Sequence, residues 1–197
     1  MTITDIRQLN PEAHHTYADY LLWEFQERVE LIRGYIRQMA APSVRHQRIS
    51  GKIYGPVWAF LRQQKCDVFA APFDVRLPLP VSRIKSDKTD TVVQPDICVI
   101  CDREKLDERG CLGAPDLIVE ILSPGNSRKE MREKYDLYEE AGVLEYWVVF
   151  PSEQVLQRYI LNEQGIYQAQ RPDVQGDHVG IGFLPGFSLN VEEIFEE

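Results

Sequence analysis

In the second half of the chain, the pattern of apolar and polar positions changes from that of a strand to that of a helix and back again. This pattern predicts a strand–helix–strand unit. Continuous apolar runs at 117–122 and 144–150 are typical of strands that are buried on both faces. Between them, residues 128–141 carry apolar side chains at helical spacing, and Ser127 with Glu130 predicts a capping box at the helix start. A strand, a helix and a second strand in this order predict a crossover in a mixed sheet.

The other elements follow from the same two periods. Helical spacing of apolar residues appears at 11–27 and at 44–63, where Ser43 is a candidate N-cap. Strand patterns appear at 29–32, 35–39, 73–77, 91–101 and 155–171, and a loop is expected at 102–115. The first two strands flank Arg33-Gly34, which predicts a hairpin turn. Two helices that cover a sheet of such strands predict an α/β or α+β fold.

The length of 197 residues predicts a single domain with one substantial core. We divide it into a helical extension at 1–27, a core at 28–150 and a β-rich C-terminal extension at 151–197. Hydrophobic residues make up 44% and charged residues 27%, which excludes wholesale disorder. The chain contains neither an apolar run of about 20 residues nor a secretory leader pattern, so we expect an intracellular, cytoplasmic protein without a membrane span.

Charge and cysteine content restrict the chemistry. The net charge of −9 argues against broad affinity for nucleic acid, although it allows a local basic groove. Cys98 and Cys101 have CxxC spacing, but the residues between them are typical of a strand interior and no second pair of zinc ligands follows. We therefore expect these two residues, Cys66 and Cys111 to be free thiols rather than zinc ligands or disulfides.

Two acids stand where a sheet would bring them together. Glu120 interrupts the apolar run 117–122, and a carboxylate buried there has to be paired, protonated or bound to a metal. Asp96 follows Pro95 at the start of another strand. If the two strands are neighbours, both carboxylates meet at one end of the sheet, where they can hold Mg²⁺.

Lys134 lies inside the apolar stripe of the helix at 128–141, between Tyr138 and Ala141 in projection. An ammonium group that faces the sheet beside two carboxylates stays charged, and it can orient water or stabilise charge on a phosphate. Together these groups predict metal-assisted hydrolysis of phosphodiesters. Simpler interpretations remain open: a structural ion pair for the glutamate, a lysine that reaches solvent, and a glycosidase-like carboxylate pair.

Five segments extend this interpretation to a family resemblance: VELIRGYI, SVRHQRISGKI, VVQPDICVI, APDLIVEILSPGNSR and EKYDLYEEAGVLEYWVV. Through them, over roughly 25–150, the chain resembles the PD-(D/E)XK nuclease superfamily, and within it a bacterial branch of uncharacterised restriction-endonuclease relatives. The resemblance implies the restriction-endonuclease-like fold, a mixed sheet flanked by helices, with added β-hairpins.

The resemblance also assigns positions in the site. Asp96 takes the place of the motif aspartate and Glu120 that of the second acid. Leu122 stands where the superfamily usually has its lysine, and the branch is thought to use a lysine on the following helix, which corresponds to Lys134. Glu30 resembles an additional acid of this branch and is a candidate further metal ligand.

His46 belongs to the recurrent "HQ" of the branch near a helix start and is a candidate for facing the site, and Asp74 and Asp116 are weaker candidates. The implied activity is that of an endonuclease dependent on Mg²⁺ or Mn²⁺, with DNA as the expected nucleic acid. We further expect a homodimer, formed through β-structure near 153–170 or through Phe183, Phe187 and Phe195. The alternative is a module that keeps the nuclease fold without catalysis and acts in binding or assembly.

Overall fold

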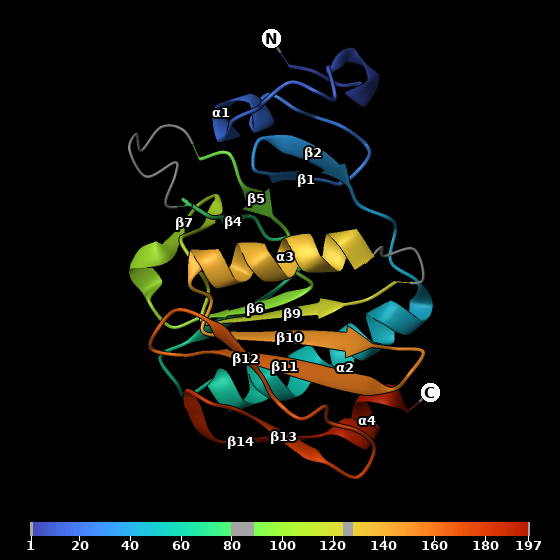
Figure 1. Ribbon diagram of the computed structural model, residues 1–197, viewed down its shortest axis with the longest axis vertical. Helices are drawn as coiled ribbons and strands as arrows, with labels where there is room; N and C mark the ends of the chain where they lie inside the picture. Colours follow the sequence, from blue (N-terminus) through green and yellow to red (C-terminus); the bar gives the residue numbers. More distant parts are fainter. Residues whose placement is uncertain (1, 80–88, 124–127, 197) are drawn as a thin grey trace.

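The computed structural model describes residues 2–79, 89–123 and 128–196, which form two mixed six-stranded sheets and one small hairpin (Figure 1). None of the helices in these residues is long and apolar enough to cross a bilayer. We call the sheet that contains the predicted strand–helix–strand unit the central sheet. Its strands, in spatial order, are β12 (Tyr167–Ala169), β11 (Val155–Leu161), β10 (Glu145–Phe150), β9 (Leu117–Ile121), β6 (Ile97–Ile100) and β3 (Asp67–Ala70).

The strand–helix–strand unit is confirmed. β9 and β10 pair in parallel, with Glu120 opposite Val148, and α3 (Arg128–Ala141) connects them. β6 lies antiparallel on the other side of β9. All residues of β9 are buried, as expected for a continuous apolar run that is covered on both faces. The predicted cap at Ser127 lies outside the described residues.

Two helices cover opposite faces of the central sheet. Successive residues of a strand point to opposite faces. Val119 packs in one core cluster with Ile53 of α2 (Val44–Leu61), whereas its neighbour Ile118 packs in a second cluster with Leu137 of α3. The sheet is therefore enclosed between α2 and α3, as the sequence predicted.

A second sheet, which we call the outer sheet, lies on the side of α3 (Figure 1). Its strands in spatial order are β2 (Tyr35–Gln38), β1 (Val29–Ile32), β5 (Val92–Val93), β4 (Val75–Arg76), β8 (Gly110–Leu112) and β7 (Leu106–Asp107). Ile32, Val75 and Val93 share a core cluster with Leu137 of α3. The predicted hairpin at Arg33-Gly34 joins β1 and β2, and both turn residues have positive φ.

The strand predicted at 91–101 is two strands in two different sheets. β5 pairs with β1 and β4 in the outer sheet, and β6 pairs with β3 and β9 in the central sheet. Residues 94–96 carry the chain from one sheet to the other. The sequence does not reveal this break, because both strands are buried and apolar and only the three residues Gln94, Pro95 and Asp96 separate them.

The C-terminal extension covers α2. β13 (His178–Ile181) and β14 (Leu184–Asn190) form a hairpin, α4 (Val191–Phe195) follows, and their apolar side chains join the cluster around α2. Phe187 and Phe195, predicted as dimer contacts, are each only 7% exposed. They belong to the core of the protomer, and this part of the prediction was wrong.

The helix predicted at 11–27 is also wrong. Only a 3-10 turn, η1 (Ile6–Gln8), and the single turn α1 (Tyr17–Tyr20) form near it. In the irregular stretch that follows α1, the ring of Trp23 contacts the ring of Tyr20 at the end of α1 and the ring of Phe25. Aromatic side chains at helical spacing thus bury their surface against each other without a continued helix.

The cysteines are not all free. β3 and β6 pair antiparallel with Asp67 opposite Ile100, which places Cys66 and Cys101 opposite each other just beyond the paired residues. These two residues form a disulfide, contrary to the prediction, whereas Cys98 and Cys111 are free and buried. The pairing depends on strand register, which the sequence alone does not give.

The loop predicted at 102–115 contains a 3-10 turn, η2 (Arg103–Lys105), and the β7–β8 hairpin. Gly110 in this hairpin has φ +116, and a Cβ there would overlap the carbonyl oxygen of Asp74. Cys111 donates its N–H to the same oxygen at 2.9 Å, which fixes the close approach of the two backbones.

We expect Gly110→Ala to lower the free energy of unfolding by about 3 kcal/mol or more, because the added methyl group meets backbone that cannot move aside. Gly165→Ala is the matched control: Gly165 has φ +75 but open space around its Cβ position. Its cost should be only the backbone strain of about 1 kcal/mol. Urea unfolding of both variants measures the difference, and equal costs would contradict the close approach.

Candidate active site

Asp96 and Glu120 lie side by side because their strands are neighbours. Ile97 of β6 pairs with Val119 of β9, which places residue 96 next to residues 120 and 121. The Ile121 N–H donates to Asp96 Oδ2 at 2.7 Å. The structure therefore brings together the two acids that the sequence singled out, at the point where the chain enters the central sheet.

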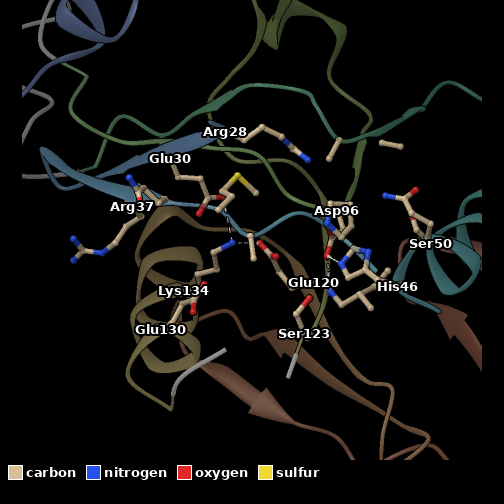
Figure 2. Close-up of a pocket in the computed structure, with 18 residues that line it drawn as sticks. Arg28, Glu30, Arg37, His46, Ser50, Asp96, Glu120, Ser123, Glu130 and Lys134 are labelled. Atoms are coloured by element: carbon tan, nitrogen blue, oxygen red, sulfur yellow. Dashed lines mark hydrogen bonds and ion pairs between the residues drawn. The ribbon is translucent and has the colours of Figure 1, made fainter. Parts of the chain in front are cut away.

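Both carboxylates line an open pocket of about 260 Å³ (Figure 2). Its walls come from β1 and β2 of the outer sheet, the first turns of α2, the end of β9 and the first half of α3. Glu30, His46 and Lys134 line the same pocket. All five candidate site residues from the sequence thus surround one space between the two sheets.

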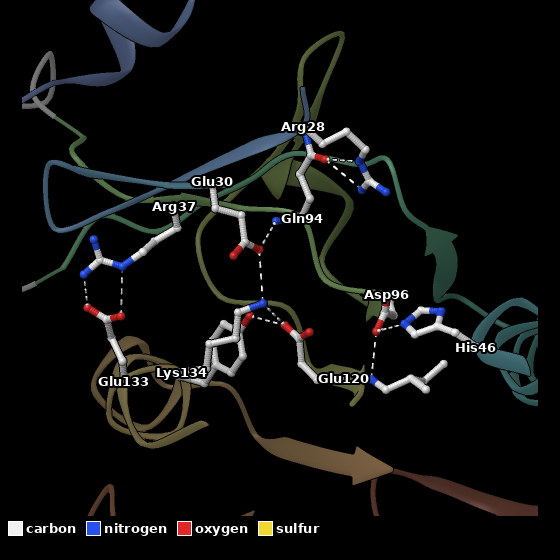
Figure 3. A network of polar contacts seen from close by, with 11 residues as sticks. Arg28, Glu30, Arg37, His46, Gln94, Asp96, Glu120, Glu133 and Lys134 are labelled. Carbon is white, nitrogen blue, oxygen red and sulfur yellow. Dashed lines mark hydrogen bonds and ion pairs between the residues drawn. The ribbon is translucent and has the colours of Figure 1, made fainter. Parts of the chain in front are cut away.

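Lys134 points into the protein and bridges two carboxylates. Its Nζ donates to Glu120 Oε1 at 2.9 Å and to Glu30 Oε1 at 3.2 Å (Figure 3). The residue is 7% exposed, so it does not extend to solvent. Tyr138, one turn further along α3, donates its hydroxyl to Glu120 Oε1 at 2.6 Å. The buried glutamate is therefore paired, which is one of the outcomes that its burial required.

Burial and neighbouring charges shift both partners of this ion pair. Burial raises the pKa of Glu120 to about 7; Lys134 opposes this shift, while Asp96 and Glu30 add to it. Burial on its own lowers the pKa of Lys134, but the fields of Glu120 and Glu30 outweigh it and hold that pKa above its ordinary value. The ammonium therefore stays charged at neutral pH, and Glu120 is the group that exchanges a proton there.

His46 holds Asp96 from the other side. Ser43 caps α2 by accepting the His46 N–H, as predicted, and this places the imidazole at the pocket. His46 Nε2 lies 3.1 Å from Asp96 Oδ2. Burial lowers the pKa of His46, and Asp96 raises it by more, so the pKa lies above its ordinary value. With His46 and the Ile121 N–H on the same oxygen, the carboxylate of Asp96 is fixed in one orientation.

Glu30 is held by the outer sheet and faces Lys134. It lies on β1 opposite Arg37 of β2, and its Oε1 accepts the backbone N–H of Gln94 at 2.9 Å as well as the ammonium of Lys134. The role of Glu30 as a further metal ligand stays a prediction.

The acids present donor atoms that suit a hard divalent cation. Both hydrogen bonds to Glu120 end on Oε1 and both to Asp96 end on Oδ2. Among the described residues, Glu120 Oε2 and Asp96 Oδ1 accept no hydrogen bond, and neither belongs to the buried unpartnered atoms. No group of three or more His, Cys, Asp or Glu side chains in the described ranges forms a ready metal cluster. Two carboxylate oxygens fit Mg²⁺, which retains several waters and uses few protein ligands.

Sequence reasoning missed two contributors to this network. Tyr138 was assigned to the apolar stripe, yet its position four residues after Lys134 on the same helix face brings its hydroxyl to the same carboxylate. Gln94, which bonds Glu30, gave no signal because its role depends on the break between β5 and β6. The weaker candidates lie elsewhere: Asp74 accepts from the side chain of Gln94, and Asp116 accepts the Cys101 N–H.

Comparison with known proteins now identifies the family. Residues 17–192 match the family Uma2, whose description is "Putative restriction endonuclease". The chain belongs to the Uma2 family. The match covers the core and most of the C-terminal extension, and it makes this Uma2 member a nuclease-like protein.

Two individual proteins are similar to this Uma2 chain. An uncharacterized protein of Synechocystis is 25% identical over 161 residues, which are 80% of this chain and 77% of that protein. A crystal structure from Anabaena variabilis, of a putative nuclease belonging to DUF820, superposes with a TM-score of 0.72 at 22% identity and covers 91% of this chain and 97% of that one. The structural similarity confirms the predicted fold class.

Glu120 makes the stability of the protein depend on pH in a defined direction. Since burial raises its pKa to about 7, the folded chain binds this proton more tightly than the unfolded chain. The resulting stabilisation is complete below the ordinary pKa of 4.5 and is lost as pH rises through about 7. Glu120→Gln removes this titration and keeps the shape of the side chain.

We therefore expect the free energy of unfolding of Glu120→Gln, relative to the unmodified protein, to rise by on the order of 3 kcal/mol between about pH 5 and about pH 8. Urea unfolding of both proteins across this range measures the difference, in which other titrating groups cancel. Parallel curves would show that Glu120 does not carry the shifted proton.

Proposed function

We propose that the protein is a metal-dependent endonuclease that hydrolyses phosphodiester bonds of nucleic acid, with DNA as the expected substrate. The observation that supports this most directly is the meeting of Asp96, Glu120 and Lys134 in one pocket. Membership of the Uma2 family supports the nuclease class. The metal, the substrate and the roles below are part of the proposal.

The metal would be Mg²⁺ or Mn²⁺, held by Asp96 Oδ1 and Glu120 Oε2, which accept no hydrogen bond from the residues that the structure describes. A bound cation of this kind supplies polarisation of a phosphoryl oxygen and a more acidic water. A cation that keeps several waters and also binds a substrate phosphate needs only these two protein ligands. Glu30 then serves mainly to hold Lys134, and joins the ligands only if the ammonium moves.

The residues of the chain supply orientation and charge. His46 and the Ile121 N–H hold Asp96, and Tyr138 holds Glu120, so that both carboxylates are fixed before substrate binds. Lys134 provides a permanent positive charge at the edge of the pocket. It stabilises the negative charge that develops on the phosphate, or orients the attacking water. The walls of the pocket limit the water around these groups, which strengthens each electrostatic contact.

A homodimer also belongs to the proposal, because two copies present two sites to the two strands of a duplex. Phe187 and Phe195 are not available for this contact, since they are buried, and Phe183 is partly buried against the same core. The remaining surface from the sequence analysis is the hairpin of β11 and β12, where β12 is an edge strand of the central sheet and two of its three residues are exposed. An exposed edge strand is suited to pairing with a second copy.

Cleavage of nucleic acid tests the proposed activity. We expect plasmid or single-stranded DNA to be cut in the presence of Mg²⁺ or Mn²⁺. Asp96→Asn and Glu120→Gln should each reduce the rate by roughly a hundredfold or more, because each removes a charged ligand and retains its shape. Asp116→Asn is the matched control: this acid belongs to a second Pro-Asp pair, and the amide oxygen can still accept the Cys101 N–H. Gel assays with RNA, duplex and single-stranded substrates measure the rates, and equal cleavage by Glu120→Gln would exclude the mechanism.

Thermal unfolding separates the enzyme from the non-catalytic alternative. A cation that binds only the folded chain stabilises it, so Mn²⁺ at about ten times its dissociation constant should raise Tm by roughly 3–5 °C. The rise should disappear in Asp96→Asn and persist in Asp116→Asn. A module with a vestigial site predicts no rise in any of the proteins, and scanning calorimetry with Mn²⁺, Mg²⁺ or EDTA distinguishes the two cases.

A further inference from the structure

The cations that line the pocket differ in how their charge is balanced. Arg37 forms a two-point ion pair with Glu133, with N–O distances of 2.8 and 3.2 Å, and Lys134 lies between Glu30 and Glu120. Arg28 bonds only a neutral group: its Nη2 and Nε donate to the amide oxygen of Gln94 at 2.9 and 3.2 Å. Among the described residues, no carboxylate forms an ion pair with Arg28.

The orientation of Gln94 is determined by its other contacts. Its Nε2 lies 2.9 Å from Asp74 Oδ1, and an ionised carboxylate can only accept a hydrogen bond. The amide nitrogen must therefore face Asp74, and the amide oxygen must face Arg28. Tyr20 bonds the same amide nitrogen and the same carboxylate, which further fixes the side chain. Gln94 thus holds the guanidinium of Arg28 in place without neutralising it.

Arg28 is also close to the proposed chemistry. It lines the pocket together with Asp96 and Glu120, and Figure 3 shows it bound to Gln94, whose backbone N–H bonds Glu30. The residue is only partly buried. Two of its five N–H donors point to Gln94, so three remain for another acceptor. A guanidinium with free donors, fixed geometry and full charge suits a phosphate group.

The charge of the site explains why such a residue is needed. Four carboxylates line the pocket, those of Glu30, Asp96, Glu120 and Glu130, and the whole chain carries −9. A polyanion that approaches this pocket meets repulsion unless a cation on its path is free to bind it. Arg37, Lys134 and His46 already have carboxylate partners, which leaves Arg28 among the described residues that line the pocket.

We propose that Arg28, held by Gln94, binds a backbone phosphate of the nucleic-acid substrate next to the phosphodiester that lies over Asp96 and Glu120. This inference rests on the proposed nuclease function and adds the residue through which an acidic protein retains its substrate. Arg28 is a binding residue here, and the reacting phosphate belongs to the pocket acids and Lys134.

Binding without catalysis tests the inference. Fluorescence anisotropy of labelled single-stranded and duplex oligonucleotides, in EDTA and at several salt concentrations, compares the full chain with Arg28→Gln, Arg28→Lys and Arg132→Gln. Arg132→Gln makes the same change of residue and of net charge on an arginine that is 85% exposed on α3 and does not line the pocket. Thermal unfolding of each variant confirms that it is folded.

We expect Arg28→Gln to weaken binding by about tenfold and to lower the slope of log affinity against log salt by about one, as for the loss of one phosphate contact. Arg28→Lys should recover much of the salt slope but only part of the affinity. It keeps the positive charge but loses the planar guanidinium that can donate two parallel hydrogen bonds to a phosphate. Arg132→Gln should bind within about twofold of the unmodified protein.

The outcomes separate the two proposals. If the unmodified protein binds and Arg28→Gln behaves like Arg132→Gln, the assignment of Arg28 is wrong while the nuclease proposal stands. If Arg28→Gln does not fold, Arg28→Lys decides: weaker binding with most of the salt slope retained supports the inference, and binding with the affinity of the unmodified protein overturns it. If the unmodified protein neither binds nor cleaves any nucleic acid, the proposed function fails, and the inference fails with it.

Discussion

The buried ammonium of Lys134 is the interaction on which the rest of the site depends. It joins three elements: Glu30 on β1 of the outer sheet, Glu120 on β9 of the central sheet, and α3, which lies between them. Taking such charges out of water is costly, and loss of one partner leaves an uncompensated charge that costs about 3–5 kcal/mol. The contacts of Lys134 with Glu30 and Glu120 therefore fix the distance between the two sheets. They also fix the width of the pocket that lies between the sheets.

The site lies where the chain changes sheets. Residues 94–96 leave β5 and enter β6, and each performs a different part of this passage. Gln94 donates its backbone N–H to Glu30 and accepts a hydrogen bond from Arg28 with its side-chain oxygen. Pro95 has no N–H that would need a strand partner. The carboxylate of Asp96 contacts His46 and accepts a backbone N–H of β9. Three successive residues thus connect the outer sheet, the pocket and the central sheet. The change of sheets therefore places an acid at a strand start in the candidate site.

Sequence reasoning reached the residues whose chemistry conflicts with their local pattern. Glu120 stood out because it interrupts a buried strand, and Lys134 because it falls within an apolar helix stripe. Both signals are local, and the neighbouring positions of β6 and β9 then bring Asp96 beside them. The missed features depend on pairing between distant segments. The disulfide of Cys66 and Cys101 follows from the register of β3 and β6, and the division of 91–101 follows from which sheet each half joins. The hydroxyl of Tyr138 was hidden because a tyrosine in an apolar stripe fits a core equally well.

The balance of charge within the pocket gives the physical reason to expect a cation there. Glu30, Asp96 and Glu120 lie beside Lys134 and His46, so these five described side chains carry more negative than positive charge even when the imidazole is protonated. A site enclosed by protein must offset such an excess with protons or with cations. Burial, together with the other two acids, raises the pKa of Glu120 to about 7, so that below this pH a proton offsets part of the excess. A divalent ion that competes with this proton would bind more tightly as pH rises, because its ligand must be deprotonated.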